Sequence, residues 1–137
     1  MLGEIVASND LLSERANELR DAFDLGHALR LFQNDIEPVP KMKIVDFIES
    51  SYPGYARISM VGKWRPVFKV IDGQYQFSSF EITFGADAAS VEVAHGWYLV
   101  GNGKVKLSCR LPFPNVMTLG GNVTVRIDCV LWAAVIL

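Results

Sequence analysis

The 137-residue chain has little of the chemistry on which most enzymes and cofactor sites depend. It contains two histidines and two cysteines, and neither pair has the spacing of metal ligands. We interpret His27 and His95 as structural or solvated residues. The sequence has no GxSxG nucleophile motif and no GxxxxGK[ST] phosphate loop. It therefore predicts a non-enzymatic protein with no catalytic residues, no cofactor and no metal.

An excess of charge of one sign is also missing. Thirteen basic and fifteen acidic residues give a formal net charge of −2, which provides no general attraction for nucleic acid or anionic lipid. The longest apolar run, residues 129–137, is shorter than the roughly 20 residues that a membrane-spanning helix needs. The first ten residues do not have the pattern of a secretory signal. We expect a soluble protein without nucleic-acid or membrane partners.

The two cysteines leave two interpretations open. Cys109 and Cys129 both lie in apolar or alternating stretches, where a free cysteine behaves as a small buried hydrophobic residue. A disulfide between neighbouring strands is the alternative, and the sequence does not decide between them.

One segment near the N-terminus has the period of a helix. Between residues 10 and 24, Leu12, Ala16, Leu19 and Phe23 recur at helical spacing. Residues 8–10 offer N-caps, and Gly26 is a plausible stop. We expect either a helix packed on its own sheet or an arm packed on a neighbouring subunit.

From residue 28 onward the apolar residues alternate with a period of two, which is typical of strands. Asp72-Gly73 between two such runs is a strong hairpin signal. The other expected strands end at turn residues, with Pro112 and Pro114 ending the strand that begins at 104. The expected strands are 28–33, 55–61, 67–71, 74–77, 91–100, 104–111 and a last strand after Gly120-Gly121, with a helical turn within 43–50.

The alternation has two irregularities. The apolar phase flips at Ser78-Ser79, which indicates either a β-bulge or a break between two strands. The last strand begins with one apolar face, but from Val130 onward its second face is apolar too. We therefore expect this strand to finish buried on both sides.

About seven or eight short strands separated by turn signals predict a mainly β protein. The expected architecture is an antiparallel β-sandwich or jelly roll with an N-terminal α-helix. We expect an N-terminal helical arm over residues 1–27 and one β-sandwich domain over residues 28–137.

Aromatic residues suggest two kinds of role. Trp64 and Trp97 would stack on a ligand or sugar if they were exposed, whereas large aromatics more often fill the interior of a sandwich. The apolar ending is interpreted either as a central strand or as a surface covered by another subunit. The residues expected at an interface with another subunit or partner are Leu12, Leu19, Phe23, Val130, Trp132, Ile136 and Leu137.

Several short motifs resemble those of small structural proteins from tailed bacteriophages. The matching pieces are residues 29–34 (LRLFQN), Pro38, residues 46–49 (DFIE), residues 54–56 (GYA), Trp64 and residues 96–100 (GWYLV). The charged N-terminal helix departs from the pattern of that family and is interpreted as an attachment arm.

This resemblance implies a virion component such as a capsid decoration (cement) protein. Such a protein would form a β-rich homotrimer on the capsid surface, bound to the major capsid protein, after assembly in the host cytoplasm. A carbohydrate-binding or receptor-binding β-sandwich of a phage tail is the alternative function.

Overall fold

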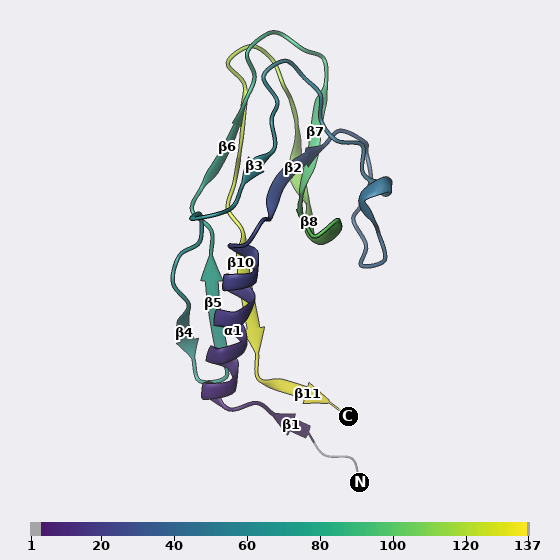
Figure 1. Cartoon of the computed structure of the whole chain (residues 1–137). Coiled ribbons are helices and arrows are strands. Elements are labelled where there is room, and N and C mark those ends of the chain that lie inside the picture. The colour runs from purple at the N-terminus through teal and green to yellow at the C-terminus, as the bar shows by residue number, and fades with distance from the viewer. Residues whose placement is uncertain (1–3, 137) are drawn as a thin grey trace.

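The computed structural model of the protein describes residues 4–136 (Figure 1). The described helices are α1 (Asn9–Phe23) and the 3₁₀ helix η1 (Ile44–Asp46). The described strands are β1 (Glu4–Val6), β2 (Ala28–Phe32), β3 (Ile58–Ser59), β4 (Phe68–Ile71), β5 (Gln74–Ser78), β6 (Ile82–Gly85), β7 (Val93–Gly101), β8 (Lys104–Val116), β9 (Asn122–Val125), β10 (Asp128–Trp132) and β11 (Ala134–Ile136).

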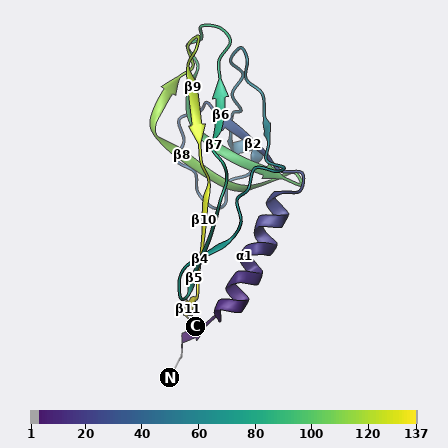
Figure 2. The same cartoon turned by 90° about the vertical axis from the view of Figure 1, so that its left-hand side faces the viewer.

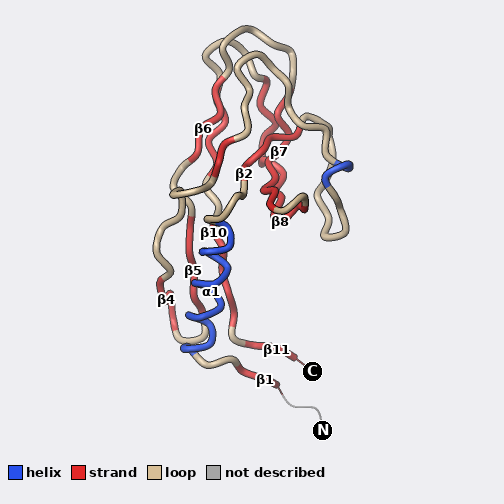
Figure 3. Tube along the Cα trace, viewed as in Figure 1, coloured by secondary structure: helices blue, strands red, loops and turns tan. Residues whose placement is uncertain are grey.

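The strands form two regions that lie end to end. The first, which we call the body, contains the four-stranded sheet β3-β2-β7-β8 and the pair β6-β9. The second, the distal sheet, has the order β10-β5-β4 and lies beside α1 (Figure 1). The pair β1-β11 lies beyond it. All of these pairings are antiparallel, and the predicted mainly β class with an N-terminal helix is confirmed (Figure 3).

The helix α1 begins and ends close to the predicted positions. The Oγ of Ser8 accepts a hydrogen bond from the backbone N–H of Leu11 at 3.1 Å, which satisfies one of the free donors at the helix start. Gly26 follows the last turn with φ at +65°, a left-handed conformation that glycine adopts at little cost. The buried side chains have the predicted spacing and are those of Leu12, Ala16 and Phe23.

The predicted tight turn at Asp72-Gly73 is present, and a second one joins β7 to β8. β4 pairs with β5 across Asp72-Gly73, and Gly73 has φ at +81°. β7 pairs with β8 across Asn102-Gly103, where both residues have positive φ, as the twist of a two-residue hairpin requires. The helical turn expected within 43–50 is η1. The strand expected over 55–61 is reduced to β3.

Pro112 and Pro114 do not end β8, contrary to the prediction. The pairing with β7 runs to Arg110 and resumes at Asn115, so residues 111–114 form a bulge. β8 is an edge strand, and proline is tolerated at the edges and bulges of a sheet because its missing N–H leaves no pairing partner unsatisfied there.

The phase flip at Ser78-Ser79 marks a break between two strands, which was one of the two expected alternatives. β5 belongs to the distal sheet, whereas β6 belongs to the body. The expected last strand is divided as well, because β9 pairs in the body and β10 in the distal sheet. The chain passes between the two regions at Ser79 and again at Ile127, and hydrogen bonds join these two points. The Ser79 N–H donates to the Ile127 carbonyl at 2.8 Å, and the Ile127 N–H donates to the Ser79 Oγ at 2.9 Å.

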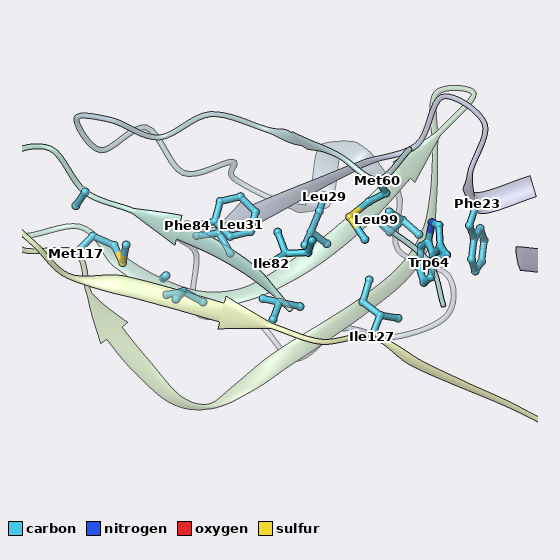
Figure 4. Packing of buried hydrophobic residues seen from close by; sticks show 14 of the residues in the cluster. Phe23, Leu29, Leu31, Met60, Trp64, Ile82, Phe84, Leu99, Met117 and Ile127 are labelled. Carbon is cyan, nitrogen blue, oxygen red and sulfur yellow. The ribbon is translucent and has the colours of Figure 1, made fainter. Parts of the chain in front are cut away.

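The main core fills the space between the two sheets of the body (Figure 4). Side chains at its centre are at most 4% exposed and are those of Leu29, Leu31, Leu99, Ile82 and Phe84. Trp64 and Phe23 continue the cluster toward the distal sheet, with ring centroids 5.5 Å apart. The helix and the body therefore share one core.

A second, smaller cluster covers the other face of the four-stranded sheet. It contains Phe32, Phe47, Tyr98 and Val100, all of them buried. The rings of Phe47 and Tyr98 are stacked, with centroids 4.5 Å apart. The central strands β2 and β7 are thus packed on both faces, which explains their nearly continuous apolar sequence.

Candidate interaction surfaces

The distal sheet has one face toward α1 and one face away from it. Phe77 of β5 is fully buried on the side of α1, and its ring centroid lies 6.1 Å from that of Phe23. Side chains alternate along a strand, so Gln74 and Gln76 lie on the opposite face. Figure 2 shows the sheet nearly edge-on, with α1 on one side of it.

The strand register identifies the other residues of that opposite face. Residues that pair directly across two strands share a face. Gln76 pairs with Phe68 and Val130, and Gln74 pairs with Ile71 and Trp132. We define the outer face as these six residues: Phe68, Ile71, Gln74, Gln76, Val130 and Trp132.

The outer face is apolar and open to solvent. Trp132 is 65% exposed, Ile71 58%, Phe68 50% and Val130 39%. The expectation that the last strand is buried on both sides is therefore wrong within one chain: among the described residues, only the α1 side of β10 is packed. An apolar patch of this kind on a folded domain typically marks an interaction site.

A groove of about 460 Å³ runs along the edge of β10 that is not paired with β5. Its walls are the free edges of β8 and β10, with Leu19 of α1 beside them. Trp97 and Leu107 contribute apolar surface from the body. Free strand edges expose backbone groups that can pair with another chain.

The structure brings together some of the predicted interface residues and separates others. Leu19 and Val130 line the groove, and Val130 and Trp132 belong to β10. Leu12 and Phe23 are 5% and 4% exposed, so they serve the core of the chain itself. Ile136 lies in β11, and Leu137 lies outside the described residues.

The two tryptophans proposed as ligand aromatics have different environments. Trp64 is 4% exposed within the main core, so its interpretation as a stacking residue is wrong and the core interpretation is confirmed. Trp97 is half-buried and lines the groove.

Both cysteines are free, and neither is fully buried. Cys109 is exposed and Cys129 is half-buried, which corrects the expectation of two buried thiols. Both line the groove. Burial raises the pKa of the Cys129 thiol to about 11, so at neutral pH nearly all of it is protonated and poorly nucleophilic.

The phage-like motifs converge on the carboxylate of Glu49. The guanidinium of Arg57 donates to both of its oxygens at 2.9 Å, and the hydroxyl of Tyr55 donates at 2.6 Å. Arg30 of β2 lies 3.8 Å away. The Tyr55 hydroxyl also accepts from the backbone N–H of Leu31, which ties the loop to the central strand.

This network shifts the titration of its members. Partial burial acts to raise the pKa of Glu49, but hydrogen bonds from Arg57 and Tyr55 outweigh it, and the pKa lies below its ordinary value of 4.5. Burial and the bond to Glu49 raise the pKa of Tyr55. Hydrogen bonds to its ionised form keep this carboxylate charged, so it is suited to holding the loop in place.

Other motif residues also have structural roles. The Oδ1 of Asn34 accepts from the Ile48 N–H at 2.9 Å, and its Nδ2 donates to the Asp46 carbonyl at 3.0 Å. A Cβ on Gly96 would overlap the ring of Phe32. The motifs thus specify how β2, β7 and the 46–57 segment pack.

The titratable groups do not assemble into a larger centre within the described chain. His27 is 5% exposed, and its Nδ1 lies 2.8 Å from the Leu25 carbonyl. His95 lies 3.9 Å from Asp35. Within residues 4–136, no three His, Cys, Asp or Glu side chains are grouped in a way that could hold a metal ion. No helix over the same range is long and apolar enough to cross a membrane.

Comparisons of the chain with protein-family models, curated proteins and solved structures found no match.

Sequence reasoning found two of the four apolar residues of the outer face and missed the other two. Val130 and Trp132 were identified from the two-sided apolar pattern. Phe68 and Ile71 were assigned to a hairpin strand, and nothing in the sequence indicates which strand lies on the far side of β5. The available signal was the sequence of β4 itself (FKVI), whose apolar residues do not alternate cleanly with polar ones.

Proposed function

We propose that the chain is a non-enzymatic structural protein that assembles through its outer face, and that its setting is a virion, where it acts as a capsid decoration protein. The observation that carries this proposal is the apolar outer face, which α1 leaves uncovered. Trp132 alone presents roughly 150 Å² of surface. Its burial would contribute up to about 4 kcal/mol to an association.

The composition of the outer face resembles the centre of a protein interface. Two apolar columns, Phe68 with Ile71 and Val130 with Trp132, border the two glutamines of β5. Interfaces place aromatic anchors at their centre and pair the polar groups that they bury. Tryptophan is among the residues most often found to dominate binding energy.

The virion setting rests on the phage-like motifs. Those motifs fix the packing of the body, as the Glu49 network illustrates, and so they are compatible with a family that shares a fold but no active site. In this proposal the chain forms a homotrimer on the capsid exterior and contacts the major capsid protein. It would be present in the host cytoplasm during assembly.

The first experiment measures the mass of the purified chain by size-exclusion chromatography with light scattering. We expect an oligomer, with a trimer as the proposed state. Trp132→Glu and a deletion of residues 130–137 should each yield monomer or prevent assembly. Val91→Glu is the matched control, because Val91 is 94% exposed outside the outer face. A wild-type monomer at every concentration would refute self-assembly, and an unchanged oligomeric mass for Trp132→Glu would refute the outer face as its interface.

A separate experiment tests the virion setting. Quantitative mass spectrometry of virus particles purified from the source of the chain should find it at a copy number comparable to that of the major capsid protein. Its absence from the particles would remove the virion setting and leave self-assembly standing.

The groove supports a second candidate, a carbohydrate-binding module. Trp97 is half-buried in the groove and presents part of its indole there, where a sugar ring could stack. The burial of Trp64 removes the second expected platform. A glycan array should then show hits that Trp97→Ala abolishes, and an array without hits removes this candidate.

A further inference from the structure

The body carries two adjacent hollows between the 38–44 segment and β8. One has a volume of about 300 Å³ and the other about 530 Å³. They share Pro40, Met42 and Val105, so they form one continuous depression. Met42 and Val105 are half-buried against the second cluster, which gives the depression an apolar floor.

Lysines surround this depression. Lys41, Lys43 and Lys104 line the larger hollow, and Lys106 lines the smaller one. Over the described part of the chain, no acidic side chain lines either hollow. None of the four lysines forms an ion pair with another described residue. The nearby Asp46 carboxylate accepts from the backbone N–H of Lys43 at 2.7 Å. The four lysines, which we call the lysine rim, therefore have no ion-pair partner among the described residues.

The opposite charge is concentrated in the N-terminal segment. Residues 1–27 contain six acidic and two basic residues, a net charge of −4, and residues 28–137 contain nine acidic and eleven basic residues, a net charge of +2. These values sum to the −2 of the whole chain.

The acidic side chains of α1 lie on the face turned away from the core. Glu14, Glu18 and Asp21 recur at spacings of four and three and are exposed, opposite the buried residues of the helix. Glu18 pairs with Arg15 at 2.8 Å, and Asp21 lies 3.5 Å from Arg20. Glu14 forms no ion pair with a described residue, so this face keeps a net negative charge.

The two surfaces also match in spacing. Lys104 and Lys106 are two residues apart on a strand, a separation of about 7 Å. Glu14 and Glu18 are four residues apart on a helix, a separation of about 6 Å. Leu11, which is 40% exposed beside the acidic face, could contact the apolar floor.

We propose that the lysine rim of one copy of the chain receives the acidic face of α1 from a second copy. This inference rests on the proposed self-assembly and specifies a contact for it. The helix packs on the distal sheet of its own chain, away from the 38–44 segment (Figure 1), so a second copy is the source of the matching helix.

This contact joins two different surfaces, so each copy uses both. Repetition of such a contact closes a ring when the rotation allows it, as in a trimer, and otherwise continues as a chain. Exposed ion pairs are individually weak and are screened by salt. We therefore expect the contact to weaken with rising ionic strength, whereas burial of Trp132 on the outer face should persist.

The test reverses charge on each surface and then on both. Lys43→Glu/Lys104→Glu and Glu14→Lys/Glu18→Lys should each raise the dissociation constant of the oligomer by about tenfold or more at low ionic strength. The chain carrying all four substitutions should recover wild-type assembly, because the charges are exchanged. Lys63→Glu, at an exposed lysine outside the hollows, is the control. Sedimentation velocity measures assembly, and thermal unfolding confirms that each variant is folded.

The outcomes separate this inference from the proposed function. If both reversed variants assemble like the wild type while Trp132→Glu does not, the lysine–helix contact is refuted and self-assembly stands. If the lysine variant weakens assembly but the variant with all four substitutions fails to restore it, α1 is refuted as the partner of the lysine rim. A wild-type chain that is monomeric at every concentration refutes both.

Discussion

The body and the distal sheet are built from similar strands but differ in how their faces are covered. In the body, the main core packs on one face of the four-stranded sheet and the second cluster packs on the other. In the distal sheet, α1 packs on one face, and the opposite face leaves Trp132 65% exposed. A sheet covered on both faces by its own chain is complete, whereas a sheet with an open apolar face is suited to a partner.

The largest difference between the regions should appear when one apolar side chain is shortened in each. Leu31 is fully buried in the body, so Leu31→Ala should lower the free energy of unfolding by about 2–5 kcal/mol. Trp132→Ala should change it by less than about 0.5 kcal/mol under conditions where the chain is monomeric, because its ring is largely solvated already. Urea unfolding at low protein concentration measures both values.

Equal losses of unfolding free energy from the two substitutions would mean that the outer face is packed within one chain. A loss for Trp132→Ala that appears only at high protein concentration would instead show that the outer face is buried between copies, since stability that depends on concentration reports association.

Local patterns were sufficient to predict the helix and the hairpins. Leu12, Ala16 and Phe23 have helical spacing, and Asp72-Gly73 has the chemistry of a tight turn. These signals depend on residues that are close in sequence. They do not say which strands become neighbours, and so the last strand, whose alternation is unbroken from Val123 to Leu131, was not expected to divide between two regions.

The local sequence also does not show which part of the chain, if any, covers a given face of a strand. The sequence around Trp132 shows that both sides of the strand are apolar, but not whether the same chain covers them. The Glu49 network was missed for a related reason. Its partner Arg30 is 19 residues away in sequence and reaches Glu49 only because β2 and the 46–57 segment pack together.

The Glu49 network should make the body sensitive to acid. Because the folded pKa of Glu49 lies below its ordinary value of 4.5, the ionised carboxylate stabilises the folded chain above that pH. This contribution is lost as the pH falls through the folded pKa. Glu49→Gln should therefore cost about 1–2 kcal/mol at neutral pH and flatten the decline in stability below about pH 4.5.

Chemical unfolding across a pH series measures this effect. Glu81→Gln, at an exposed carboxylate, is the control and should preserve the wild-type pH profile. A Glu49→Gln variant as stable as the wild type at neutral pH would show that the network does not stabilise the body.

A smaller effect is expected at the start of the helix that covers the distal sheet. Ser8→Ala removes the cap on the Leu11 N–H and should cost about 1 kcal/mol. Ser13→Ala, inside the same helix, should be neutral or slightly stabilising, since alanine has the higher helix propensity. Relative to the wild type, Ser8→Ala should show faster hydrogen exchange in α1 and β5, whereas exchange in β2 and β7 should be unchanged. Uniformly faster exchange would instead mean that the two regions unfold as one unit.

The smallest change concerns the two thiols, one from each region, that line the same groove. Burial raises the pKa of both Cys109 and Cys129, and that of Cys129 rises to about 11. Since Cys109 is exposed and Cys129 is half-buried, a thiol reagent at neutral pH should label Cys109 first and Cys129 much more slowly. Cys109→Ser and Cys129→Ser assign the two phases. Equal rates would show that β10 separates readily from the body, and the groove would then be a transient feature of the fold.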